Sequence, residues 1–372
     1  MNNKNVTIIG GAGFLAKELV IQLLEKGYRV TVADISITED VLPPSLKNCT
    51  KYFNNKQLTC INGDITDKDT LNLIPHDTNS LIHIAGYFRF WPIDNGLAYK
   101  INIEGTKNVC HYAANHPCIE NCLYYSSVES IGTMKDRAMY PGAKENTRPL
   151  DSELKHCLYK QTKTKAHDLV EKYFDIFEKK GKRLSIHAPP TPFGPGMETV
   201  PTGDLIKKDT GLINWISPKT ILSCAYTGDI ARDSLLILEK GLHGKTYVSV
   251  GFHASIPEIL ETKVKIIREE LGMKNAFAPK FHLPNWSLPL IAKSMEFVGN
   301  VYKKYTPEMT LEQAIRTTQN HWYDTSMTRK DLGLNDEYLG LYETVRKVCI
   351  YLYENKLFGS MASANEKGSS VN

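Results

Sequence analysis

A tyrosine and a lysine four residues apart are the residues of this sequence best suited to acid–base chemistry. They occur in Tyr159-Lys-Gln-Thr-Lys163, within a stretch of helical pattern, so both side chains lie on one face, one turn apart. An ammonium group near a phenol stabilises the phenolate and lowers the phenol pKa. Tyr159 is therefore predicted to exchange a proton with a carbonyl or alcohol oxygen. The spacing by itself is common, and its weight depends on its surroundings.

Two serines follow a short apolar strand pattern at residues 121–126. The segment reads Tyr124-Tyr-Ser-Ser-Val-Glu-Ser-Ile-Gly132, which places hydroxyl groups at the carboxyl end of a strand. Ligands bind at this edge in open α/β folds. Ser127 is predicted to hydrogen-bond the same substrate oxygen as Tyr159, and a capped strand end is the purely structural alternative.

Three glycines lie between the first strand pattern and the first helix pattern, in Val6-Thr-Ile-Ile-Gly-Gly-Ala-Gly-Phe-Leu-Ala. Gly10 permits a tight turn, and Gly13 lets the backbone approach a pyrophosphate at a helix N-terminus. The strand before and the helix after make dinucleotide binding a better prediction than a simple glycine turn. The predicted cofactor-binding loop comprises Gly10, Gly11, Ala12, Gly13, Phe14 and Leu15.

Acidic residues follow the second and third strand patterns. Asp34 lies where a carboxylate accepts hydrogen bonds from the adenosine ribose hydroxyls. It would repel a 2′-phosphate, and no arginine stands beside it in Ala33-Asp-Ile-Ser, so NAD is favoured over NADP. Asp64 is predicted to accept a hydrogen bond from the adenine amino group, with Ile65 against the ring.

The fourth strand pattern ends in small residues, in His83-Ile-Ala-Gly86. Ala85 and Gly86 suit a place where backbone passes close to a bound cofactor. His83 is interpreted as structural.

Strand and helix patterns alternate through the first half of the chain. Strands are predicted over 6–9, 28–33, 58–61, 80–85, 121–126 and 184–188, and helices over 13–26, 98–115 and 159–180. This alternation predicts an α/β fold, a Rossmann-type doubly wound parallel sheet with right-handed crossovers.

A second, smaller part of the chain follows a proline-rich break. Ala188-Pro-Pro-Thr-Pro-Phe-Gly-Pro-Gly predicts a loss of regular structure, and the sequence beyond residue 250 is mainly helical. We expect an NAD-binding domain from residues 1–188 and 221–250 and a substrate-binding lobe from 189–220 and 251–355. Residues 359–372 are expected to be disordered.

Composition excludes several function classes. The net charge of +4 comes from scattered basic residues, which does not indicate nucleic-acid binding. The cysteines lack Cys-x-x-Cys and zinc spacing, so no metal is predicted; they favour a reducing, cytoplasmic setting, with disulfides left open. No signal peptide or membrane span is visible. Residues 286–302 are predicted to form an amphipathic helix that packs on the protein, with association to a membrane surface as the less favoured alternative.

Together these motifs resemble the extended short-chain dehydrogenase/reductases over most of the chain. The resemblance also rests on Asn102-Ile-Glu-Gly-Thr106, on the Gly-Pro-Gly at 194–196 and on Tyr226-Thr-Gly-Asp229. It implies that Ser127, Tyr159 and Lys163 are catalytic, that Tyr159 and Lys163 also contact the cofactor, and that Asn102 and Pro189 belong to the cofactor pocket. It further implies a homodimer through helices 98–115 and 159–180.

Within that family the chain is similar to the branch of 3β-hydroxysteroid dehydrogenases, dihydroflavonol reductases and hopanoid-associated sugar epimerase-like proteins. It departs from the pattern at Ala16, where a third glycine is usual, and at Asp34, where reductases of this branch often carry arginine.

The resemblance implies reversible hydride transfer between NAD and a secondary alcohol or ketone. Aromatic residues in segments expected to cover the pocket favour a bulky or ring-shaped small-molecule substrate, although they would equally suit an interlobe core. They are Tyr87, Phe88, Phe90, Trp91, Phe193 and Trp215.

Two alternatives share this fold. An NAD-dependent nucleotide-sugar epimerase or dehydratase would use the same Tyr159 and Lys163. Dehydration is disfavoured because Ser127-Val128-Glu129 lacks the adjacent acids of family dehydratases. An epimerase needs a cationic clamp for the diphosphate, for which Arg89, Arg232 and Arg316 are candidates. A non-catalytic dinucleotide-sensing regulator is disfavoured because the Tyr/Lys pair is retained.

Overall fold

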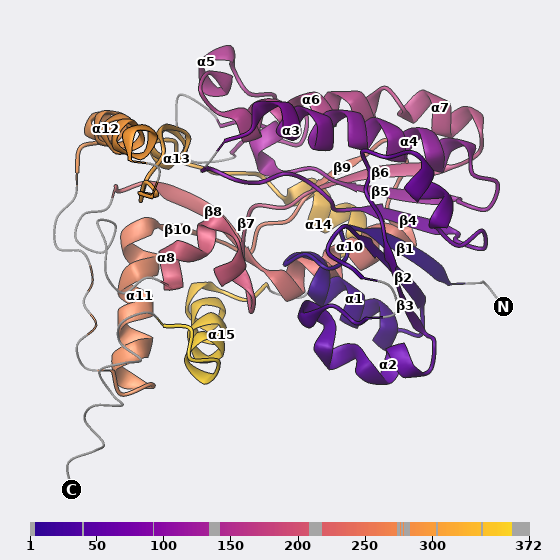
Figure 1. The fold of residues 1–372 in the computed structure, drawn as a ribbon, viewed down its shortest axis with the longest axis horizontal. Coiled ribbons are helices and arrows are strands. Elements are labelled where there is room, and N and C mark those ends of the chain that lie inside the picture. Colours follow the sequence, from indigo (N-terminus) through magenta and orange to yellow (C-terminus); the bar gives the residue numbers. More distant parts are fainter. Residues whose placement is uncertain are drawn as a thin grey trace, which may run out of the picture.

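The structure is a computed structural model, shown in Figure 1, in which two lobes lie side by side. It describes residues 4–38, 41–91, 93–133, 142–207, 218–273, 276, 278, 283–302, 304–335 and 338–358. The predicted tail at 359–372 and the predicted lid residue Trp215 lie outside the described residues.

A seven-stranded sheet in the order β3-β2-β1-β4-β5-β6-β9 forms the core of the larger lobe. Every pair of neighbouring strands in it is parallel, which confirms the predicted Rossmann-type sheet. Its strands are β1 (Asn5–Ile9), β2 (Arg29–Asp34), β3 (Leu58–Asn62), β4 (Ser80–His83), β5 (Asn121–Tyr125), β6 (Arg183–Ala188) and β9 (Thr246–Val248). Apolar strands such as Asn5–Ile9 are buried throughout, because a parallel sheet is covered on both faces.

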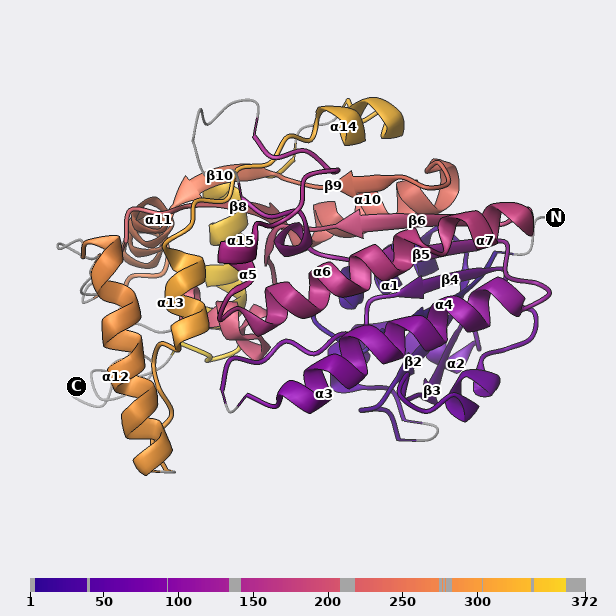
Figure 2. The same cartoon turned by 90° about the horizontal axis from the view of Figure 1, so that it is seen from above.

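Helices cover both faces of this sheet (Figures 1 and 2). One face carries α3 (Asn95–Tyr99), α4 (Thr106–Asn115), α6 (Leu158–Glu171) and α7 (Phe174–Lys179), and the other carries α1 (Ala16–Glu25) and α10 (Thr227–Lys240). Each face has its own buried apolar cluster. The short helices α2 (Thr50–Asn54) and α5 (Asp151–Leu154) also belong to this lobe.

Three helices differ from their predicted bounds. The first begins at Ala16, not at residue 13, because the preceding loop is made of tighter turns, in which Gly13 and Ala16 each bond to a carbonyl three residues back. The helix predicted over 159–180 is two helices, broken where the Tyr173 amide bonds to the Val170 carbonyl. The helix predicted over 98–115 contains a π-helical turn at Lys100–Gly105.

The smaller lobe contains a three-stranded sheet in the order β10-β8-β7. Its strands are β7 (Thr191–Phe193), β8 (Ile221–Tyr226) and β10 (Phe252–Ser255). The proline-rich segment therefore contains a strand, contrary to the prediction. Pro192 pairs with Ala225 in a strand at the sheet edge, where a missing amide is tolerated.

Helices make up the rest of the smaller lobe, as predicted. They are α8 (Asp204–Lys207), α11 (Ile256–Glu269), α12 (Leu288–Val301), α13 (Leu311–Thr317) and α15 (Leu341–Glu354). Another helix, α14 (Ser326–Leu332), returns to the larger lobe and packs on α10 and β9. No helix in the described ranges is long and apolar enough to cross a membrane.

The strand order reverses between β1 and β4, which extend the sheet in opposite directions. In open α/β sheets this reversal leaves a crevice beyond the carboxyl ends of the two strands, where ligands bind. The glycine loop follows β1 and the Ile84–Gly86 segment follows β4, so both predicted cofactor segments border this crevice.

Candidate active site

A cavity of about 610 Å³ extends from the glycine loop to helix α13. The predicted site residues that line it are Gly10, Gly13, Phe14, Leu15, Asp34, Asp64, Ile65, Ala85, Gly86, Ser127, Tyr159, Lys163 and Pro189. Gly11, Ala12 and Asn102 were predicted with them but are not among the lining residues. The sheet edge thus brings together residues that lie far apart in the sequence.

Close backbone packing explains the first glycine of the loop. Gly10 has a φ of +82°, and a Cβ there would lie 2.5 Å from the Ala85 backbone nitrogen. Only glycine fits such a position. Gly11 has a different role, since a Cβ there would meet Val32 of β2 at 2.8 Å. It therefore allows loop–strand packing and does not face the cavity.

Asp34 organises the turn at the end of β2. Its carboxylate accepts hydrogen bonds from the Ala12 amide at 3.3 Å and from the Ser36 amide and hydroxyl at 2.9 and 2.8 Å. It thereby joins the glycine loop to the second strand at one end of the cavity. Asp64 similarly accepts from the Thr66 amide at 2.8 Å.

Asn102 lies behind the cavity wall and binds two of the segments that form it. Its Oδ1 accepts from the Tyr87 amide at 2.7 Å, and its Nδ2 donates to the Tyr87 carbonyl at 3.1 Å and to Thr162 Oγ1 at 2.9 Å. It is buried in the π-helical turn, a distortion that is frequent at functional sites. Asn102 therefore links the loop after β4 to helix α6, and it is not among the residues that line the cavity.

The three predicted catalytic residues meet at the far end of the cavity. Ser127 follows β5 and lines the cavity with Tyr159, where its side chain acts to lower the Tyr159 pKa. Lys163 lies one helical turn beyond Tyr159 and donates to the Tyr124 hydroxyl at 3.2 Å and to the Tyr125 carbonyl at 2.7 Å. The serine and the tyrosine can therefore hold one oxygen atom between them, with the lysine behind.

The pKa values of this group differ from the sequence expectation. Burial raises the Tyr159 pKa to about 12, although Arg316 and the Ser127 hydrogen bond act in the opposite direction. Burial lowers the Lys163 pKa to about 7. The charge that lowers the tyrosine pKa in this structure therefore comes from Arg316 and not, as the sequence suggested, from Lys163.

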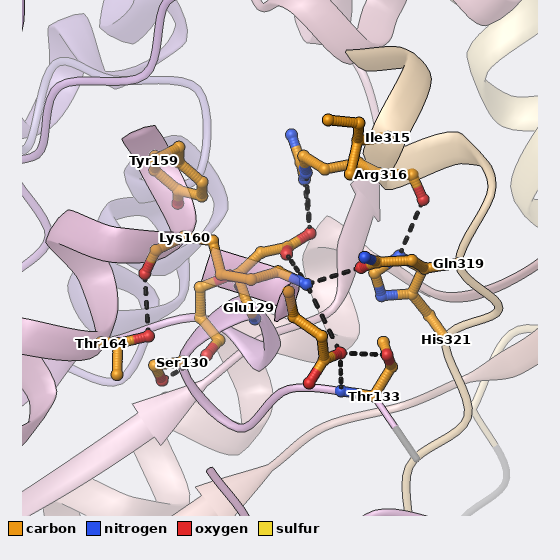
Figure 3. A network of polar contacts seen from close by, with 12 residues as sticks. Glu129, Ser130, Thr133, Tyr159, Lys160, Thr164, Ile315, Arg316, Gln319 and His321 are labelled. Atoms are coloured by element: carbon orange, nitrogen blue, oxygen red, sulfur yellow. Dashed lines mark hydrogen bonds and ion pairs between the residues drawn. The ribbon is translucent and has the colours of Figure 1, made fainter. Parts of the chain in front are cut away.

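A buried polar network lies next to Tyr159 (Figure 3). Arg316 donates from Nε and Nη2 to Glu129 Oε1 at 3.0 and 2.6 Å. Lys160 lies 3.4 Å from Glu129 Oε2 and donates to Gln319 Oε1 at 2.8 Å. Burial alone would raise the Glu129 pKa, but Arg316 and Lys160 outweigh it and hold this pKa well below its usual range.

The aromatic residues of the predicted lid have different surroundings. Phe88 lines the cavity with its ring centroid 4.5 Å from that of Tyr159. Phe90 and Phe193 are buried, and Phe193 belongs to the apolar core of the smaller lobe. Trp91 packs near Gly299 of α12. Phe88 thus fits the interpretation as a pocket-lining residue, whereas Phe193 fits the interpretation as a core residue.

The candidate clamp arginines are also separated. Arg89 is exposed and Arg232 is paired with Asp229 and Asp233, so only Arg316 of the three lines the cavity. Its guanidinium group already contacts Glu129. Among the described residues, no group of His, Cys, Asp and Glu could hold a metal ion.

The chain is similar in sequence to a known family and to several known proteins. The 3-beta hydroxysteroid dehydrogenase/isomerase family matches residues 7–247. A Synechocystis sp. protein provisionally named dihydroflavonol 4-reductase is 27% identical over 332 residues, which cover 88% of this chain and 89% of the relative. The decarboxylating sterol-4-alpha-carboxylate 3-dehydrogenase of Homo sapiens is 26% identical over 290 residues, covering 76% of this chain and 70% of the relative.

Solved structures share the whole fold. UDP-glucuronic acid 4-epimerase from Bacillus cereus, in complex with NAD, has a TM-score of 0.68 at 20% identity and covers 94% of this chain and 99% of its own. Yeast methylglyoxal/isovaleraldehyde reductase, complexed with NADPH, has a TM-score of 0.70 at 16% identity and covers 95% and 99%.

The parallel sheet, the glycine loop and the Ser/Tyr/Lys group define an enzyme of the extended short-chain dehydrogenase/reductase class. Within this class, the chain belongs to the 3-beta hydroxysteroid dehydrogenase/isomerase family.

Proposed function

We propose that this enzyme transfers hydride between a nicotinamide dinucleotide and a secondary alcohol or ketone of a bulky, ring-shaped small molecule. The observation that carries the proposal is that Ser127, Tyr159 and Lys163 line one end of a cavity that begins at the glycine loop. The apolar ring of Phe88 beside Tyr159 favours an apolar ring in the substrate.

Each residue of the group has a distinct role in the proposed reaction. In the direction of oxidation, Tyr159 accepts the hydroxyl proton while Ser127 holds the substrate oxygen in place. In the direction of reduction, the protonated phenol donates that proton, consistent with a pKa of about 12. Lys163 is buried beneath the pair and would hold ribose hydroxyls. The bound dinucleotide supplies the hydride acceptor or donor.

The cavity residues fit a dinucleotide. A cradle at Gly10 that excludes any side chain allows backbone to approach a pyrophosphate. Asp34, at the other side of the loop, suits the adenosine ribose. We infer that residues 1–188 and 221–250 hold this cofactor, and that residues 189–220 and 251–355 hold the substrate.

We further propose that the cofactor is NAD rather than NADP, because Asp34 lines the cavity and its carboxylate would repel a 2′-phosphate. Titration calorimetry of the purified chain should give a Kd for NAD⁺ at least tenfold below that for NADP⁺. In an Asp34→Ser variant this preference should shrink to within about threefold. Equal affinity of the parent chain for both dinucleotides would reverse the assignment.

The reaction is tested with a panel of ring alcohols, beginning with the 3β-hydroxysteroid pregnenolone, in the presence of NAD⁺. Turnover is followed by NADH absorbance. The Tyr159→Phe variant should lose about 10²- to 10⁴-fold in kcat, because it cannot exchange the proton, while its Kd for NAD⁺ stays unchanged. A Tyr159→Phe variant as active as the parent would remove Tyr159 from the mechanism.

A second candidate function is epimerisation of a nucleotide sugar. The likeness to UDP-glucuronic acid 4-epimerase supports it, since the same Tyr159 and Lys163 would serve. The pairing of Arg316 with Glu129 weighs against it, because a diphosphate would have to displace that carboxylate. Incubation with UDP-glucuronic acid separates the two functions. Conversion of the sugar without net NADH, by protein purified with retained NAD, would establish the epimerase.

A further inference from the structure

Helix α13 of the smaller lobe contacts both segments that carry the proposed catalytic residues. It presents Glu312 and Arg316 one turn apart, and therefore on the same face. Glu312 is 3% exposed, and the Arg316 side chain is 16% exposed. A buried carboxylate and a mostly buried guanidinium group thus lie together beside Tyr159.

Glu312 binds the N-terminus of helix α6. Its Oε1 accepts the Tyr159 amide at 3.0 Å, and its Oε2 accepts the Leu158 amide at 3.1 Å. The first amides of a helix have no partner within it, and Cys157 provides no side-chain cap. A carboxylate from the other lobe therefore completes this helix end and fixes the backbone of Tyr159.

Arg316 binds the segment that carries Ser127. Its two donors contact Glu129 Oε1, and the Glu129 amide donates to Ser127 Oγ at 3.2 Å. Since the Ser127 side chain also acts on the Tyr159 hydroxyl and lowers its pKa, these interactions form a ring. The ring runs from Tyr159 through Glu312 and Arg316 to Glu129 and Ser127 (Figure 3 shows its Arg316–Glu129 part).

We infer that Glu312 and Arg316 are positioning residues, which together hold the Ser127 hydroxyl and the Tyr159 hydroxyl at the separation that suits one substrate oxygen. This inference rests on the proposed function, because it takes Ser127 and Tyr159 as the catalytic pair. It gives the smaller lobe a part in the chemistry besides substrate binding.

The position of α13 makes it a link between the lobes. Its first amide, that of Leu311, donates to Glu296 of α12 at 2.7 Å. Beyond its C-terminus, the His321 amide donates to the Ile221 carbonyl of β8 at 2.8 Å. A shift of the smaller lobe would therefore move Glu312 and Arg316, and with them the reacting hydroxyls.

The charges around Tyr159 provide a readout that a purely structural contact would not move. Arg316 lowers the Tyr159 pKa, whereas Glu129 and Glu312 raise it. The charged or titratable groups around Tyr159 are Arg316 and Glu312 from α13, Glu129 from the turn after β5, Tyr124 from β5 and Lys163 from its own helix. Phe88 from the loop after β4 adds an apolar wall.

The experiment follows the ionisation of Tyr159 alone. The full chain is prepared with 3,5-difluorotyrosine at position 159, saturated with NAD⁺, and titrated by fluorine NMR. The Arg316→Gln change should raise the midpoint by about one pH unit, a tenfold lower phenolate-to-phenol ratio, because it removes a cation and leaves the negative charge of Glu129 less compensated. The double change Arg316→Gln/Glu129→Gln should bring the midpoint most of the way back to that of the parent, because Arg316 lowers the Tyr159 pKa and Glu129 raises it.

Matched controls come from outside the site. Arg346→Gln removes an arginine paired with Glu270 on the surface, and Glu258→Gln removes the carboxylate of the capping box of α11. Neither change should move the midpoint. An Arg316→Gln protein that still binds NAD⁺ and titrates like the parent would overturn the inference.

A second variant covers the case in which Arg316→Gln does not fold. Glu312→Gln keeps one acceptor for the α6 amides and should lower the midpoint by about half a pH unit; an unchanged midpoint would overturn the inference equally. The titration needs no substrate, so its result is independent of the alcohol panel. Full activity of Tyr159→Phe would refute the proposed function instead.

Once an active alcohol is known, Glu312→Gln should lower kcat about tenfold with KM unchanged.

Discussion

Lys163 is a residue of the proposed site whose burial lowers the stability of the folded protein. Its side chain is buried and donates to two uncharged acceptors, the Tyr124 hydroxyl and the Tyr125 carbonyl. Without a carboxylate in these contacts, the ammonium form is poorly solvated, and burial lowers its pKa to about 7. Such unfavourable placement is expected of a residue retained for binding or catalysis.

A Lys163→Met variant is therefore expected to be more stable and less active. The folded pKa of about 7 lies below the ordinary value of 10.5, so between these values the unfolded chain binds the extra proton. The stability of the parent should rise with pH across this window, and the variant should lack this rise. Near pH 7 the variant should gain a few kcal/mol of unfolding free energy, while kcat falls at least about 100-fold.

Urea denaturation of the dinucleotide-free protein near pH 7 and again near pH 9.5 measures this difference. The difference in unfolding free energy between the variant and the parent should be smaller at the higher pH. A difference that stays constant with pH would mean that Lys163 keeps an ordinary pKa in the folded protein.

Local sequence patterns were sufficient to predict the Ser/Tyr/Lys group that lines the cavity. They did not predict the polar network beside this group. Tyr159 and Lys163 form a pair within one helical turn, and Ser127 follows an apolar strand, so short-range spacing was sufficient. Glu129 and Arg316 are 187 residues apart and meet only because the smaller lobe folds back onto α6. No local period records such a contact, and Glu312 carried no signal in the sequence at all.

At the scale of elements, strands were easier to predict than the ends of helices. Continuous apolar runs between turn residues predicted six of the seven strands of the large sheet to within a residue or two, but not β9. The beginning of α1 depends on the turns of the glycine loop, which hydrophobic periodicity does not encode. The short β7 strand was missed because proline density is evidence against a strand, except at a sheet edge.

Under the proposed function, cofactor binding depends most directly on the glycine loop. Gly10→Ala should weaken NAD⁺ binding more than tenfold and reduce the unfolding free energy by about 2 kcal/mol, because the methyl group would overlap the Ala85 backbone. Calorimetry and thermal unfolding measure the two effects.

Gly27 provides a matched control for this change. Its φ of +81° is nearly the same as that of Gly10, but a Cβ there meets nothing within 4 Å. Gly27→Ala should cost about 1 kcal/mol of conformational strain and leave NAD⁺ binding intact. If both variants bound NAD⁺ alike, the close approach at Gly10 would not be what shapes the cofactor site.

At the scale of the whole molecule, histidines with lowered pKa values lie in both lobes. Burial lowers the pKa of His83 in β4 and His187 in β6 to about 3, and that of His253 in β10 and His321 after α13 to about 4. Below their ordinary value of 6.5, the unfolded chain binds protons that the folded chain does not. Mild acid should therefore destabilise both lobes.

His187 allows this acid sensitivity to be measured at one residue. Its ring bonds to Ser234 Oγ at 2.8 Å and to Ser249 Oγ at 2.7 Å, contacts that a glutamine amide can partly replace. For the parent, a folded pKa of about 3 means that stability is fully present above pH 6.5 and falls as the pH decreases. Between pH 7.5 and pH 5, this histidine should account for about 2 kcal/mol of the loss.

The His187→Gln variant should therefore lose about 2 kcal/mol less unfolding free energy over that interval than the parent does, as measured by urea denaturation at both pH values. The exposed His111 gives the control, and His111→Gln should follow the parent. Burial raises the pKa of Asp229 and Asp233, which acts in the opposite direction on the total, so the difference between variants is the informative quantity. Equal losses in His187→Gln and in the parent would show that His187 takes up its proton without unfolding, and that the buried polar cluster around it opens to admit the charge.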